Sequence, residues 1–576
     1  MKNGADRLVD VLTAWGVDHV YGLPGDSIDT TVEGIRRQSD KIKFIQVRHE
    51  EVGALAAAAE AKLTDKLAVC LSIGGPGAIH MLNGLYDAKM DHAPVLALLG
   101  QVESNLLNTG YFQEVNTPQL FEDVAVYNRS VTSVDHLAET VDEAIRTAYE
   151  KKGVAVLTIP DDIPQKKLAT AFKPTANSFK VQKPVVPMAE VEEAVELMNR
   201  AKKPIALFGT GIKHSGEIMQ RFVETYKIPF VQTLPAKGFI PDDHPNSLGQ
   251  VGKLGTKAAY HAMKEADLIV MVGTNYPYTA YLPETGRAKS IQINLEPSHL
   301  NKRYPADVAI HGDAGEVVSA LLNSGIQASD GQFLASCQKR MATWNSWVEE
   351  KKDLKGSPLA PEVLFDQIKK TAPRDAVFAI DVGTATSWSS RYLPVGRDQQ
   401  YTISAWLGTM GCALPAAIAS SQVYPDRQVI SINGDGAFAM VMEDFVTAVK
   451  YKMPLINIVL NNRKLAFIQY EQQSAGQMNY AIDLADMDYA KFAEAAGGIG
   501  YTVTNKQEFA QALKKAYKSK DRPVLINAYV ADDAPLPGQI VANEAKGYTK
   551  FGTQYLTKKH QLPKLPPIKD IMRHFF

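Results

Sequence analysis

Two polar motifs in the last third of the chain have the residue types and the spacing to bind a metal ion and a diphosphate. Val429–Gly436 (VISINGDG) is an apolar run that ends in a Gly-Asp-Gly turn, and Leu455–Asn462 (LINIVLNN) is a second apolar run that ends in two asparagines. Apolar, β-branched runs of this length predict strands buried on both faces. One helix and the second strand fit between the motifs, so the carboxyl ends of neighbouring parallel strands would place Asp435 beside Asn462.

Asp435 and Asn462 offer ligands that a hard divalent cation prefers. A carboxylate and an amide oxygen, joined by a main-chain carbonyl near Lys464, form an oxygen site for Mg²⁺ or Ca²⁺ that leaves room for two oxygens of a diphosphate. Gly436 and Ala437 would free the N–H groups of the following helix N-terminus for that diphosphate. An isolated Gly-Asp-Gly is usually an ordinary turn. Its combination with Asn-Asn, each at the end of a buried strand, favours the metal site.

This paired motif resembles the diphosphate-binding signature of thiamine-diphosphate enzymes, and Ile45–Gly53 (IQVRHEEVG) agrees with the resemblance. The segment predicts a strand that leads into a helix starting near Glu50. In the family a buried Glu after an Arg-His pair hydrogen-bonds the aminopyrimidine ring of the coenzyme, so the resemblance implies Glu50, and not Glu51, for this role. Burial helps such a carboxyl group to pass a proton in both directions. Taken alone, a Glu that opens an Ala-rich helix is a charge favoured by the helix dipole.

Glycine-rich turns accompany these motifs. Gly74–Gly77 (GGPG) follows the apolar run Leu67–Ser72, and its lack of side chains would let the backbone approach the coenzyme. Gly408–Gly411 (GTMG) resembles the family segment whose bulky residue wedges under the coenzyme, which implies that role for Met410; ordinary core packing is the alternative. The resemblance implies further coenzyme contacts at Gly25, Gly75, Asn83, Gly383, Gly408 and Ile468.

The elements that must position these residues repeat along the whole chain. Short apolar runs, each followed by Gly or Pro and then by a helical pattern, predict parallel sheets built from βαβ units. Besides the runs named above, they are Val95–Gly100, Val154–Pro160, Ile205–Gly209, Leu268–Gly273, Ile291–Leu295, Val377–Gly383 and Val524–Val530. The pattern restarts twice, which predicts an α/β protein with three doubly wound parallel-sheet domains.

Two seams divide these domains. Gln165–Pro187 is rich in lysine and proline and has little periodicity, which is typical of a linker, and residues 324–361 form a second seam with a helix around Phe333–Glu350. With the resemblance, we expect a thiamine pyrimidine-binding domain at residues 1–165 and a central FAD-binding domain at 188–325. A thiamine diphosphate and Mg²⁺ domain is expected at 360–540, followed by a tail at 541–576.

The composition excludes several classes of protein. With 576 residues, 45% of them hydrophobic and 22% charged, the chain is too long for one core and too apolar for wholesale disorder. The 62 basic and 63 acidic residues give a net charge of -1, so there is no basic field for nucleic acid. Three scattered cysteines fit a reducing compartment. The sequence shows no targeting segment and no apolar stretch long enough for a bilayer, which predicts a cytoplasmic location.

The whole chain resembles the pyruvate oxidase branch of the acetolactate synthase and pyruvate oxidase family. The segments that carry this resemblance are Tyr21–Ser27 (YGLPGDS), Arg48–Ala54 (RHEEVGA), Asn83–Asp87 (NGLYD), Tyr111–Glu114 (YFQE) and Asn461–Glu471 (NNRKLAFIQYE). The branch has Phe, Ile and Glu where this chain has Phe467, Ile468 and Glu471, whereas acetolactate synthases usually have Trp in place of that Glu. The resemblance implies that Phe112 and Gln113 line the substrate pocket. It places Phe467 between the thiamine and flavin rings and Glu471 at the phosphate end.

The resemblance implies oxidative decarboxylation of pyruvate, with phosphate and O2, to acetyl phosphate, CO2 and H2O2. The reaction would pass through a hydroxyethyl adduct of thiamine diphosphate and would deliver two electrons to FAD in the central domain. The flavin contacts that it implies are Gly209, Gly211, Thr233, Asn275, Asn294 and Asp313. Gly209 and Gly211 follow an apolar run and suit a phosphate contact, although so short a glycine pattern is weak by itself. At Asn294 the family commonly has Asp, so an amide replaces one carboxylate acceptor.

The expected phosphate site departs from the family pattern. The resemblance places the phosphate near Ser27 and Lys253, and a related oxidase has Arg at the position of Lys253, so the charge is kept without the bidentate geometry. Asp26 replaces a Gly beside Ser27, and a carboxylate that faced an incoming phosphate would repel it.

Two other functions compete with a pyruvate oxidase. One is a carboligase of acetolactate-synthase type in which FAD is structural or absent. The other is a non-catalytic nucleotide-binding protein, which the presence of Glu50, Asp435 and Asn462 together disfavours.

The resemblance also bears on partners. Small molecules, namely pyruvate, phosphate and O2, are the expected substrates. In the family the two halves of a site come from different subunits, which implies a homo-oligomer of at least two chains and, by family habit, a tetramer. The segment Tyr555–Phe576 mixes lysine with apolar residues, as do the membrane-binding tails of quinone-linked oxidases. Its three prolines favour a loosely docked tail instead.

Overall fold

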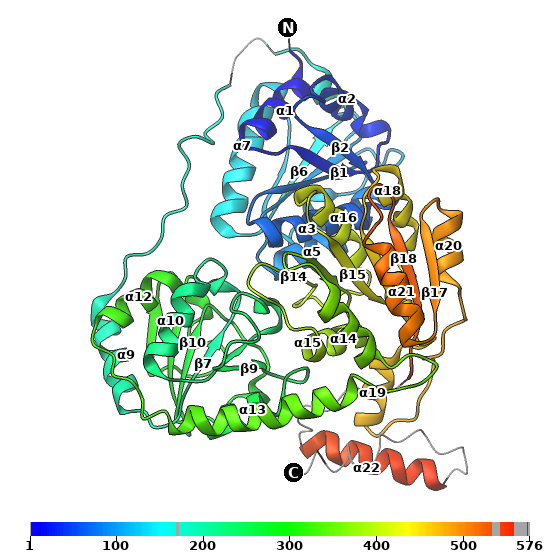
Figure 1. The fold of residues 1–576 in the computed structure, drawn as a ribbon. Coiled ribbons are helices and arrows are strands. Elements are labelled where there is room, and N and C mark those ends of the chain that lie inside the picture. The colour runs from blue at the N-terminus through cyan, green and yellow to red at the C-terminus, as the bar shows by residue number, and fades with distance from the viewer. Residues whose placement is uncertain (1, 169–171, 533–541, 558–572, 574–576) are drawn as a thin grey trace.

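The fold consists of three six-stranded parallel sheets, each covered by helices (Figure 1). A computed structural model describes residues 2–168, 172–532, 542–557 and 573. The strand orders are β2-β1-β3-β4-β6-β5, β12-β11-β10-β7-β8-β9 and β14-β13-β15-β16-β18-β17. The predicted α/β class with three doubly wound parallel sheets is confirmed.

The first sheet belongs to the N-terminal third of the chain. Its strands are β1 (His19–Gly22), β2 (Lys43–Gln46), β3 (Ala68–Ser72), β4 (Val95–Gln101), β5 (Ala125–Ser130) and β6 (Val154–Pro160). Its helices are α1 (Gly4–Ala14), α2 (Asp29–Arg37), α3 (Glu50–Thr64), α4 (Pro76–His80), α5 (Leu82–Met90), α6 (Thr117–Leu120), α7 (Val134–Lys151) and α8 (Asp162–Gln165).

The second sheet forms the central domain. Its strands are β7 (Pro204–Phe208), β8 (Phe230–Gln232), β9 (Ser247–Gln250), β10 (Leu268–Val272), β11 (Lys289–Asn294) and β12 (Val308–His311). Its helices are α9 (Met188–Arg200), α10 (Gly216–Tyr226), α11 (Lys257–Glu265) and α12 (Ala314–Asn323). Helix α13 (Gln332–Lys351) then leads to the third domain and confirms the helix predicted in that seam.

The third sheet carries the two polar motifs. Its strands are β13 (Val377–Ile380), β14 (Gln400–Thr402), β15 (Val429–Gly434), β16 (Ile456–Asn461), β17 (Ile499–Val503) and β18 (Val524–Tyr529). Its helices are α14 (Pro361–Thr371), α15 (Thr384–Tyr392), α16 (Ala413–Val423), α17 (Asp435–Phe438), α18 (Phe445–Lys450), α19 (Ala466–Ser474), α20 (Tyr489–Ala495) and α21 (Lys506–Ala516), followed by α22 (Ala542–Thr557).

Each sheet has a reversal where the chain, after adding strands on one side of its first strand, continues on the other side, and several of the sequence motifs follow strands at these points. The reversals fall between β1 and β3, between β7 and β10, and between β13 and β15. In open parallel sheets ligands bind in the crevice at the carboxyl ends of the strands at such a point. By this rule, the loops that follow these six strands are the candidate ligand-binding loops.

Helix α3 connects all three domains. Its Ala-rich middle packs against α16 in one continuous hydrophobic core shared by the first and third domains. From this helix the Lys62 ammonium contacts the Asp87 carboxylate at 2.7 Å and donates to the Ile403 carbonyl at 3.1 Å. At its C-terminal end Lys213 of the central domain donates to the main-chain carbonyls of Lys62 and Leu63. The helix that begins at Glu50 is thus held by both neighbouring domains.

A buried charge network ties α3 to strand β1 and makes stability depend on pH. The imidazole of His19 contacts the carboxylates of Asp18 and Glu60, and the Tyr21 hydroxyl donates to the same Glu60 oxygen. Burial alone would lower the pKa of His19, but the two carboxylates outweigh burial and raise it to about 9. Since the ordinary histidine pKa is about 6.5, this network stabilises the fold fully below that pH and loses its contribution as pH rises toward 9.

We therefore expect the thermal midpoint to fall as pH rises from about 6.5 to about 9. The measurement is thermal unfolding at a series of pH values for the protein and for a His19→Gln variant. The variant should show a flatter pH dependence across this range, because it has no group to deprotonate at that position. Parallel curves for the two proteins would contradict the assignment.

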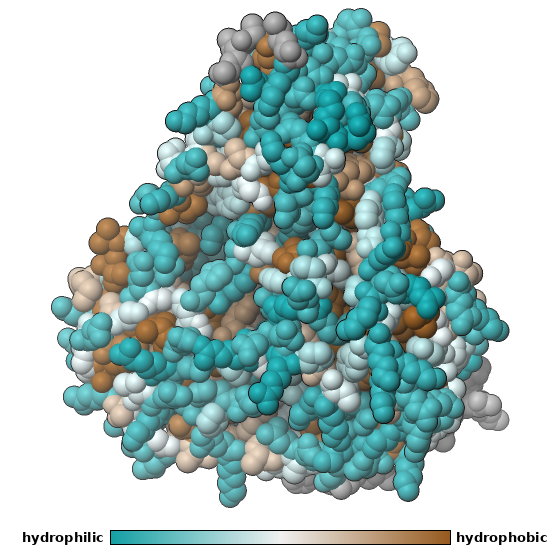
Figure 2. Space-filling model, turned by 45° about the horizontal axis from the view of Figure 1, so that its top comes forward, coloured by the Kyte–Doolittle hydropathy of each residue, from teal (hydrophilic) through white to brown (hydrophobic). Residues whose placement is uncertain are grey.

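The surface and the C-terminal tail are relevant to whether the protein binds or crosses a membrane. Within the described residues, no helix is both long enough and apolar enough for a membrane crossing. The face in Figure 2 is mainly hydrophilic, with separate hydrophobic patches. Helix α22 packs on α19 so closely that a Cβ at Gly547 would collide with the Ser474 carbonyl oxygen. Of the tail predicted at 541–576, residues 542–557 form α22 and Arg573 pairs with Glu350, while residues 541, 558–572 and 574–576 lie outside the described part.

Candidate functional site

The two polar motifs of the third domain meet at the edge of its sheet. Strands β15 and β16 are parallel neighbours with Gly434 opposite Leu460, as the spacing predicted. The buried Asp435 accepts the N–H of Arg463 at 2.6 Å on one carboxylate oxygen and the N–H of Gly436 at 2.9 Å on the other. The Asn462 side-chain oxygen accepts the Lys464 N–H at 3.1 Å. The loops that carry the expected metal ligands therefore lie against one another.

The donor set at this edge fits a hydrated divalent cation and a diphosphate. Burial raises the pKa of Asp435 to about 6, against the lowering effect of the main-chain N–H groups. A bound cation would lower the pKa of Asp435 again, because its positive charge favours the ionised carboxylate. Around it, ideal Cβ atoms at Gly383, Gly408 and Gly434 meet no heavy atom within 4 Å, so the glycines leave open space. Lys464 directs its amine to Asp532 at 2.7 Å and leaves only its main chain for the cation.

The expected wedge residue lies beside this motif. An ideal Cβ at Gly436 would be 3.7 Å from the Met410 methyl carbon, so the two loops are in contact distance. Asp381, which is fully buried, holds the Met410 loop. Its carboxylate accepts the N–H groups of Gly411 at 2.9 Å and of Ala413 at 3.3 Å. Burial raises the pKa of Asp381 to about 6. The sequence analysis missed Asp381, although it follows strand β13 much as Asp435 follows β15.

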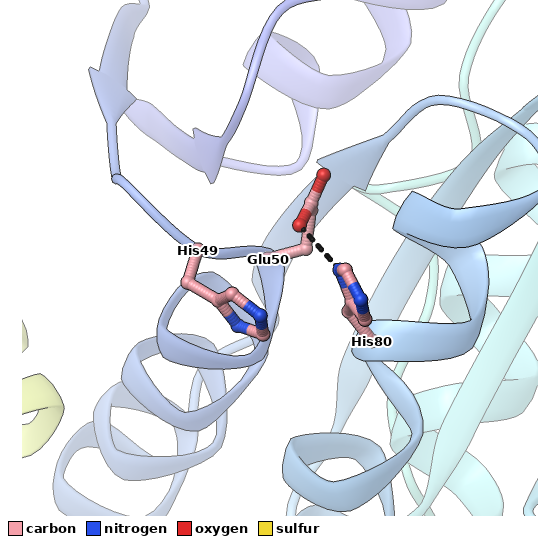
Figure 3. A group of neighbouring side chains, drawn as sticks. All are labelled: His49, Glu50 and His80. Carbon is pink, nitrogen blue, oxygen red and sulfur yellow. Dashed lines mark hydrogen bonds and ion pairs between the residues drawn. The ribbon is translucent and has the colours of Figure 1, made fainter. Parts of the chain in front are cut away.

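Glu50 forms a second polar group on the first domain. It is the first residue of α3, as predicted, and only 7% of it is exposed. Figure 3 shows its carboxylate turned toward His80, whose Nδ1 lies 3.0 Å from Oε2. A Cβ at Gly77 would lie 2.9 Å from the other carboxylate oxygen, so the glycine turn packs directly against the acid. His80, at the end of α4, was not predicted, because nothing in its local sequence points to Glu50.

His49, Glu50 and His80 offer ligand atoms within 4.8 Å of one another, a spacing that would suit a metal ion. However, the two imidazole rings are stacked, with centroids 4.4 Å apart and planes 28° apart. Lone pairs in the planes of nearly parallel rings do not converge on one ion as zinc coordination requires. His49 Nδ1 also accepts the Glu51 N–H. The arrangement suits a carboxyl group that exchanges a proton rather than a metal centre.

Asn83 links the two halves of one chain. Its side-chain amide donates to Glu51 at 2.6 Å and to the Thr409 hydroxyl at 2.8 Å, next to Met410. Glu51 is therefore engaged in a structural bond, which agrees with the choice of Glu50 as the acid.

The other residues expected near the substrate lie around the Gly74–Gly77 turn. Gly75 has φ +58°, and a Cβ there would lie 2.8 Å from the Gln113 carbonyl oxygen, so the Gly75 and Gln113 loops touch. Phe112 is 75% exposed in the single chain. The Ser27 hydroxyl accepts the Gly74 N–H at 3.1 Å. In the same segment, a Cβ at Gly25 would collide with the Ile73 side chain, so this position favours glycine. The exposed Asp26 accepts the Ser27 N–H with its carboxylate.

Lys253, Phe467 and Glu471 come together from two domains. The Lys253 ammonium lies 3.5 Å from a Glu471 carboxylate oxygen and 5.2 Å from the centre of the Phe467 ring. All three side chains are partly exposed, and Ile468 on the same helix is 42% exposed. Arg391 holds the Lys253 loop by donating to the Lys253 and Leu254 carbonyl oxygens. Sequence reasoning missed Arg391, whose role depends on a contact between separate domains.

The flavin contacts expected from sequence lie in the central domain, where the loops after β7 and β10 pack against one another. Cβ atoms at Gly209 and Gly211 would lie within 2.6 Å of the Gly273 backbone, so both glycines allow close approach of the two loops. The buried polar side-chain atoms of Thr233 and Asn275 have no hydrogen-bond partner within the described residues, which fits a ligand that would supply one. These residues fit the predicted flavin contacts.

Two other predicted flavin residues are engaged within the protein. The Asn294 amide donates to the Thr274 carbonyl, and its oxygen accepts the Glu296 N–H. Asp313 caps helix α12 through the N–H groups of Gly315 and Glu316. The hydrogen bonds that Asn294 and Asp313 make within the protein limit how many further bonds each side chain could make to a nucleotide.

Comparison with known proteins agrees with this geometry. Three family models of thiamine pyrophosphate enzymes match in chain order: the N-terminal TPP binding domain at residues 2–120, the central domain at 191–321 and the C-terminal TPP binding domain at 381–528. The chain is 44% identical over 576 residues to YdaP of Bacillus subtilis, described as thiamine pyrophosphate-containing, with 100% of each chain covered.

Two named enzymes are more distant relatives. The pyruvate oxidase of Lactiplantibacillus plantarum is 34% identical over 575 residues, covering 99% of this chain and 95% of the relative. The large subunit of acetolactate synthase isozyme 2 of Escherichia coli is 30% identical over 539 residues, covering 92% and 95%.

Proposed function

The chain belongs to the thiamine pyrophosphate enzymes of the acetolactate synthase and pyruvate oxidase kind, and from this premise we propose that it is a pyruvate oxidase. Enzymes of this kind act on 2-oxo acids, and the finer assignment is our proposal. The reaction takes pyruvate, phosphate, O2 and one proton to acetyl phosphate, CO2 and H2O2. Carbon dioxide leaves pyruvate, the acetyl group bonds to a phosphate oxygen, and O2 receives the two electrons as hydrogen peroxide.

The protein's part in the chemistry is to bind, orient and move a proton. Asp435, Asn462 and the main chain at Lys464 would hold Mg²⁺ and through it the diphosphate of the coenzyme. The bound coenzyme supplies an acidic carbon and an electron sink for decarboxylation. Glu50 holds or releases one proton at its carboxyl group, and the glycine turn packed against it limits the access of water. Met410, whose side chain lies beside the Gly436 turn, would support the ring system of the coenzyme.

The observation that carries the oxidase assignment is the meeting of Lys253, Phe467 and Glu471. The partly exposed ammonium group provides a positive charge for an anionic acceptor of the acetyl group. The ion pair between Lys253 and Glu471 is weak, because solvent screens both partners, so phosphate could compete for the lysine. The Asp26 carboxylate accepts the N–H of Ser27 at 2.8 Å, so one of its oxygens is engaged in a local bond.

Flavin binding is part of the proposal and rests on the loops after β7 and β10. The unpartnered polar atoms of Thr233 and Asn275 support it. The residues that would hold FAD here are those of the Gly209–Gly211 turn together with Thr233 and Asn275.

The alternative function is an acetolactate-synthase-type carboligase, which the 30% identity to the Escherichia coli isozyme 2 subunit supports. The two functions separate in one experiment. We expect the purified protein to show a flavin absorption band that bleaches when pyruvate is added without oxygen. Admission of O2 should restore the band and produce H2O2, and acetyl phosphate should form only when phosphate is present.

The contradicting results are equally specific. A flavin band that persists while acetolactate accumulates would assign the carboligase function. A pyruvate-reduced flavin that releases acetate at the same rate with and without phosphate would replace phosphate by water as acceptor.

We also propose a homo-oligomer of at least two chains, with a tetramer of paired dimers as the larger assembly. Among the described contacts, none joins the Glu50 group to Asp435 within one chain. Phe112 on the first domain is 75% exposed and Met440 on the third is 61% exposed. Large apolar side chains with this exposure in a single chain are typical of surfaces that a second chain covers. A mass measurement in solution tests this assembly, and an active monomer would contradict it.

A further inference from the structure

We propose that Asp444 of the third domain is a positioning residue for Glu50, which it orients through the main-chain N–H groups that precede the acid. The inference rests on the proposed role of Glu50 and adds a residue from another domain to its support. Asp444 ends a short 3-10 turn (Met442–Asp444) directly before α18.

The first observation concerns strand β2, which is the edge strand of the first sheet. The outer side of an edge strand presents N–H and C=O groups without a neighbouring strand. Tyr451, at the end of α18, satisfies two of them: its hydroxyl accepts the Gln46 N–H at 2.7 Å and donates to the Phe44 carbonyl at 3.1 Å. Side chains of the third domain thus take the place of a missing strand.

Asp444 continues this replacement into the turn that carries the acid. One carboxylate oxygen accepts the Arg48 N–H at 2.8 Å, and the other accepts the His49 N–H at 3.2 Å. His49 is the N-cap of α3, and Glu50 is its first helical residue. Fixing these two N–H groups fixes the direction in which α3 leaves the strand, and therefore where the Glu50 carboxylate points.

The second observation is the burial of this carboxylate. Asp444 is 0% exposed, and its third hydrogen bond comes from the Thr447 hydroxyl at 2.7 Å. Burial raises the pKa of Asp444 to about 6, and the neighbouring charge of Glu443 adds to the effect, while the three hydrogen bonds oppose it. A buried carboxylate held by N–H and O–H donors is costly compared with a neutral residue. The carboxylate has two acceptor oxygens and can bind both main-chain N–H groups, whereas the side-chain amide of Asn has only one acceptor oxygen.

Asp444 also lies close in sequence to the metal motif. Helix α17 begins at Asp435, and a short stretch of chain leads from it to the 3-10 turn. One continuous segment of the third domain therefore carries the expected metal ligand at its start and the support of Glu50 at its end.

The test is the variant Asp444→Asn, which keeps the size but removes one acceptor oxygen. In the enzyme loaded with thiamine diphosphate and Mg²⁺, we measure exchange of the coenzyme C2 proton for deuterium by NMR after acid quenching. The exchange rate should fall about 10–100-fold, the usual effect of a small misplacement of a reacting group. The dissociation constant of the coenzyme should change less than about threefold, since the metal end is untouched. Pyruvate, phosphate and flavin take no part in this assay.

Asp142 provides a matched control in the first domain. It is 1% exposed and accepts the Thr175 N–H, the Thr175 hydroxyl, the Trp15 ring N–H and the Arg146 guanidinium N–H. Asp142→Asn removes a similar buried acceptor far from Glu50 in the sequence and should leave the C2 exchange rate at the wild-type value. Slowing in both variants to the same extent would show a general loss of structure and overturn the proposal.

A second readout does not depend on the coenzyme. Amide hydrogen exchange of the peptide covering residues 44–52, measured on the coenzyme-free protein, should be at least about tenfold faster in Asp444→Asn. If that variant does not fold, Thr447→Val, which removes the hydroxyl bonds to Asp444 and to the Gln46 carbonyl but keeps the Asp444 carboxylate, should give a smaller change in the same direction. Wild-type C2 exchange together with wild-type amide exchange overturns the proposal. If Glu50→Gln itself leaves C2 exchange unchanged, the role of Glu50 fails, and the amide measurement still tests the contact.

Discussion

Replacing Glu50 by Gln is expected to lower turnover about 10²–10⁴-fold, the usual effect of removing a positioned proton-transfer group. The amide has nearly the same shape, so the packing against the Gly77 turn should remain. It cannot exchange a proton with the coenzyme ring. Steady-state turnover with pyruvate, measured at saturating thiamine diphosphate and Mg²⁺, gives the effect directly.

Glu51 offers a control next to this position. Its carboxylate accepts the Asn83 amide and has no described contact with His80, so Glu51→Gln should lower turnover far less than Glu50→Gln. Wild-type turnover in Glu50→Gln would remove Glu50 from the mechanism. A larger loss in Glu51→Gln would exchange the roles of the two residues.

Replacing Asp435 by Ala is expected to weaken the binding of thiamine diphosphate and Mg²⁺ by at least about 100-fold, since even outer partners of metal ligands are worth 10–100-fold. The residue lies at the junction of the two motif loops, and its carboxylate also accepts the Arg463 N–H. The variant therefore loses a cation ligand and a loop contact together. Fluorescence titration of the coenzyme-free protein with the coenzyme, at several Mg²⁺ concentrations, measures the loss.

Asp488 provides the control for the loop contact. It caps helix α20 in the same domain by accepting the N–H groups of Ala490 and Lys491. Asp488→Ala should lower the unfolding temperature without a comparable loss of Mg²⁺-dependent binding. Tight, Mg²⁺-independent binding of the coenzyme by Asp435→Ala would contradict the metal assignment.

The two variants should fail in different ways. Glu50→Gln is expected to keep the coenzyme and lose rate, whereas Asp435→Ala is expected to lose the coenzyme and recover part of its rate at high coenzyme and Mg²⁺ concentrations. This difference reflects the opposite ends of the coenzyme on which the two residues act.

The buried centre of each sheet was predictable from sequence because its strands are apolar on both faces. β4, β6, β15 and β16 appear where the apolar runs are, and the pair of loops after β15 and β16 meets as their spacing requires. Short or edge strands were missed, such as β14 (Gln400–Thr402) and β17 (Ile499–Val503). In β17 most residues are only partly buried, so the alternating or apolar signal of a strand is absent.

The residues that position the site were harder to predict from sequence than the motifs themselves. Asp444 contacts a residue 396 positions away in the chain, and Lys253 meets Glu471 over a separation of 218. No local pattern marks such pairs, because the contact depends on how two domains pack. Asp26 is the opposite case, because its contact is local: its carboxylate accepts the N–H of the next residue, Ser27.

The most direct test of the account is a crystal structure grown with thiamine diphosphate and Mg²⁺. The account predicts the cation bound between Asp435, Asn462 and the diphosphate, with the aminopyrimidine ring within hydrogen-bonding distance of a Glu50 carboxylate contributed by a second chain. A coenzyme located in another crevice, or a cation that contacts neither Asp435 nor Asn462, would contradict it.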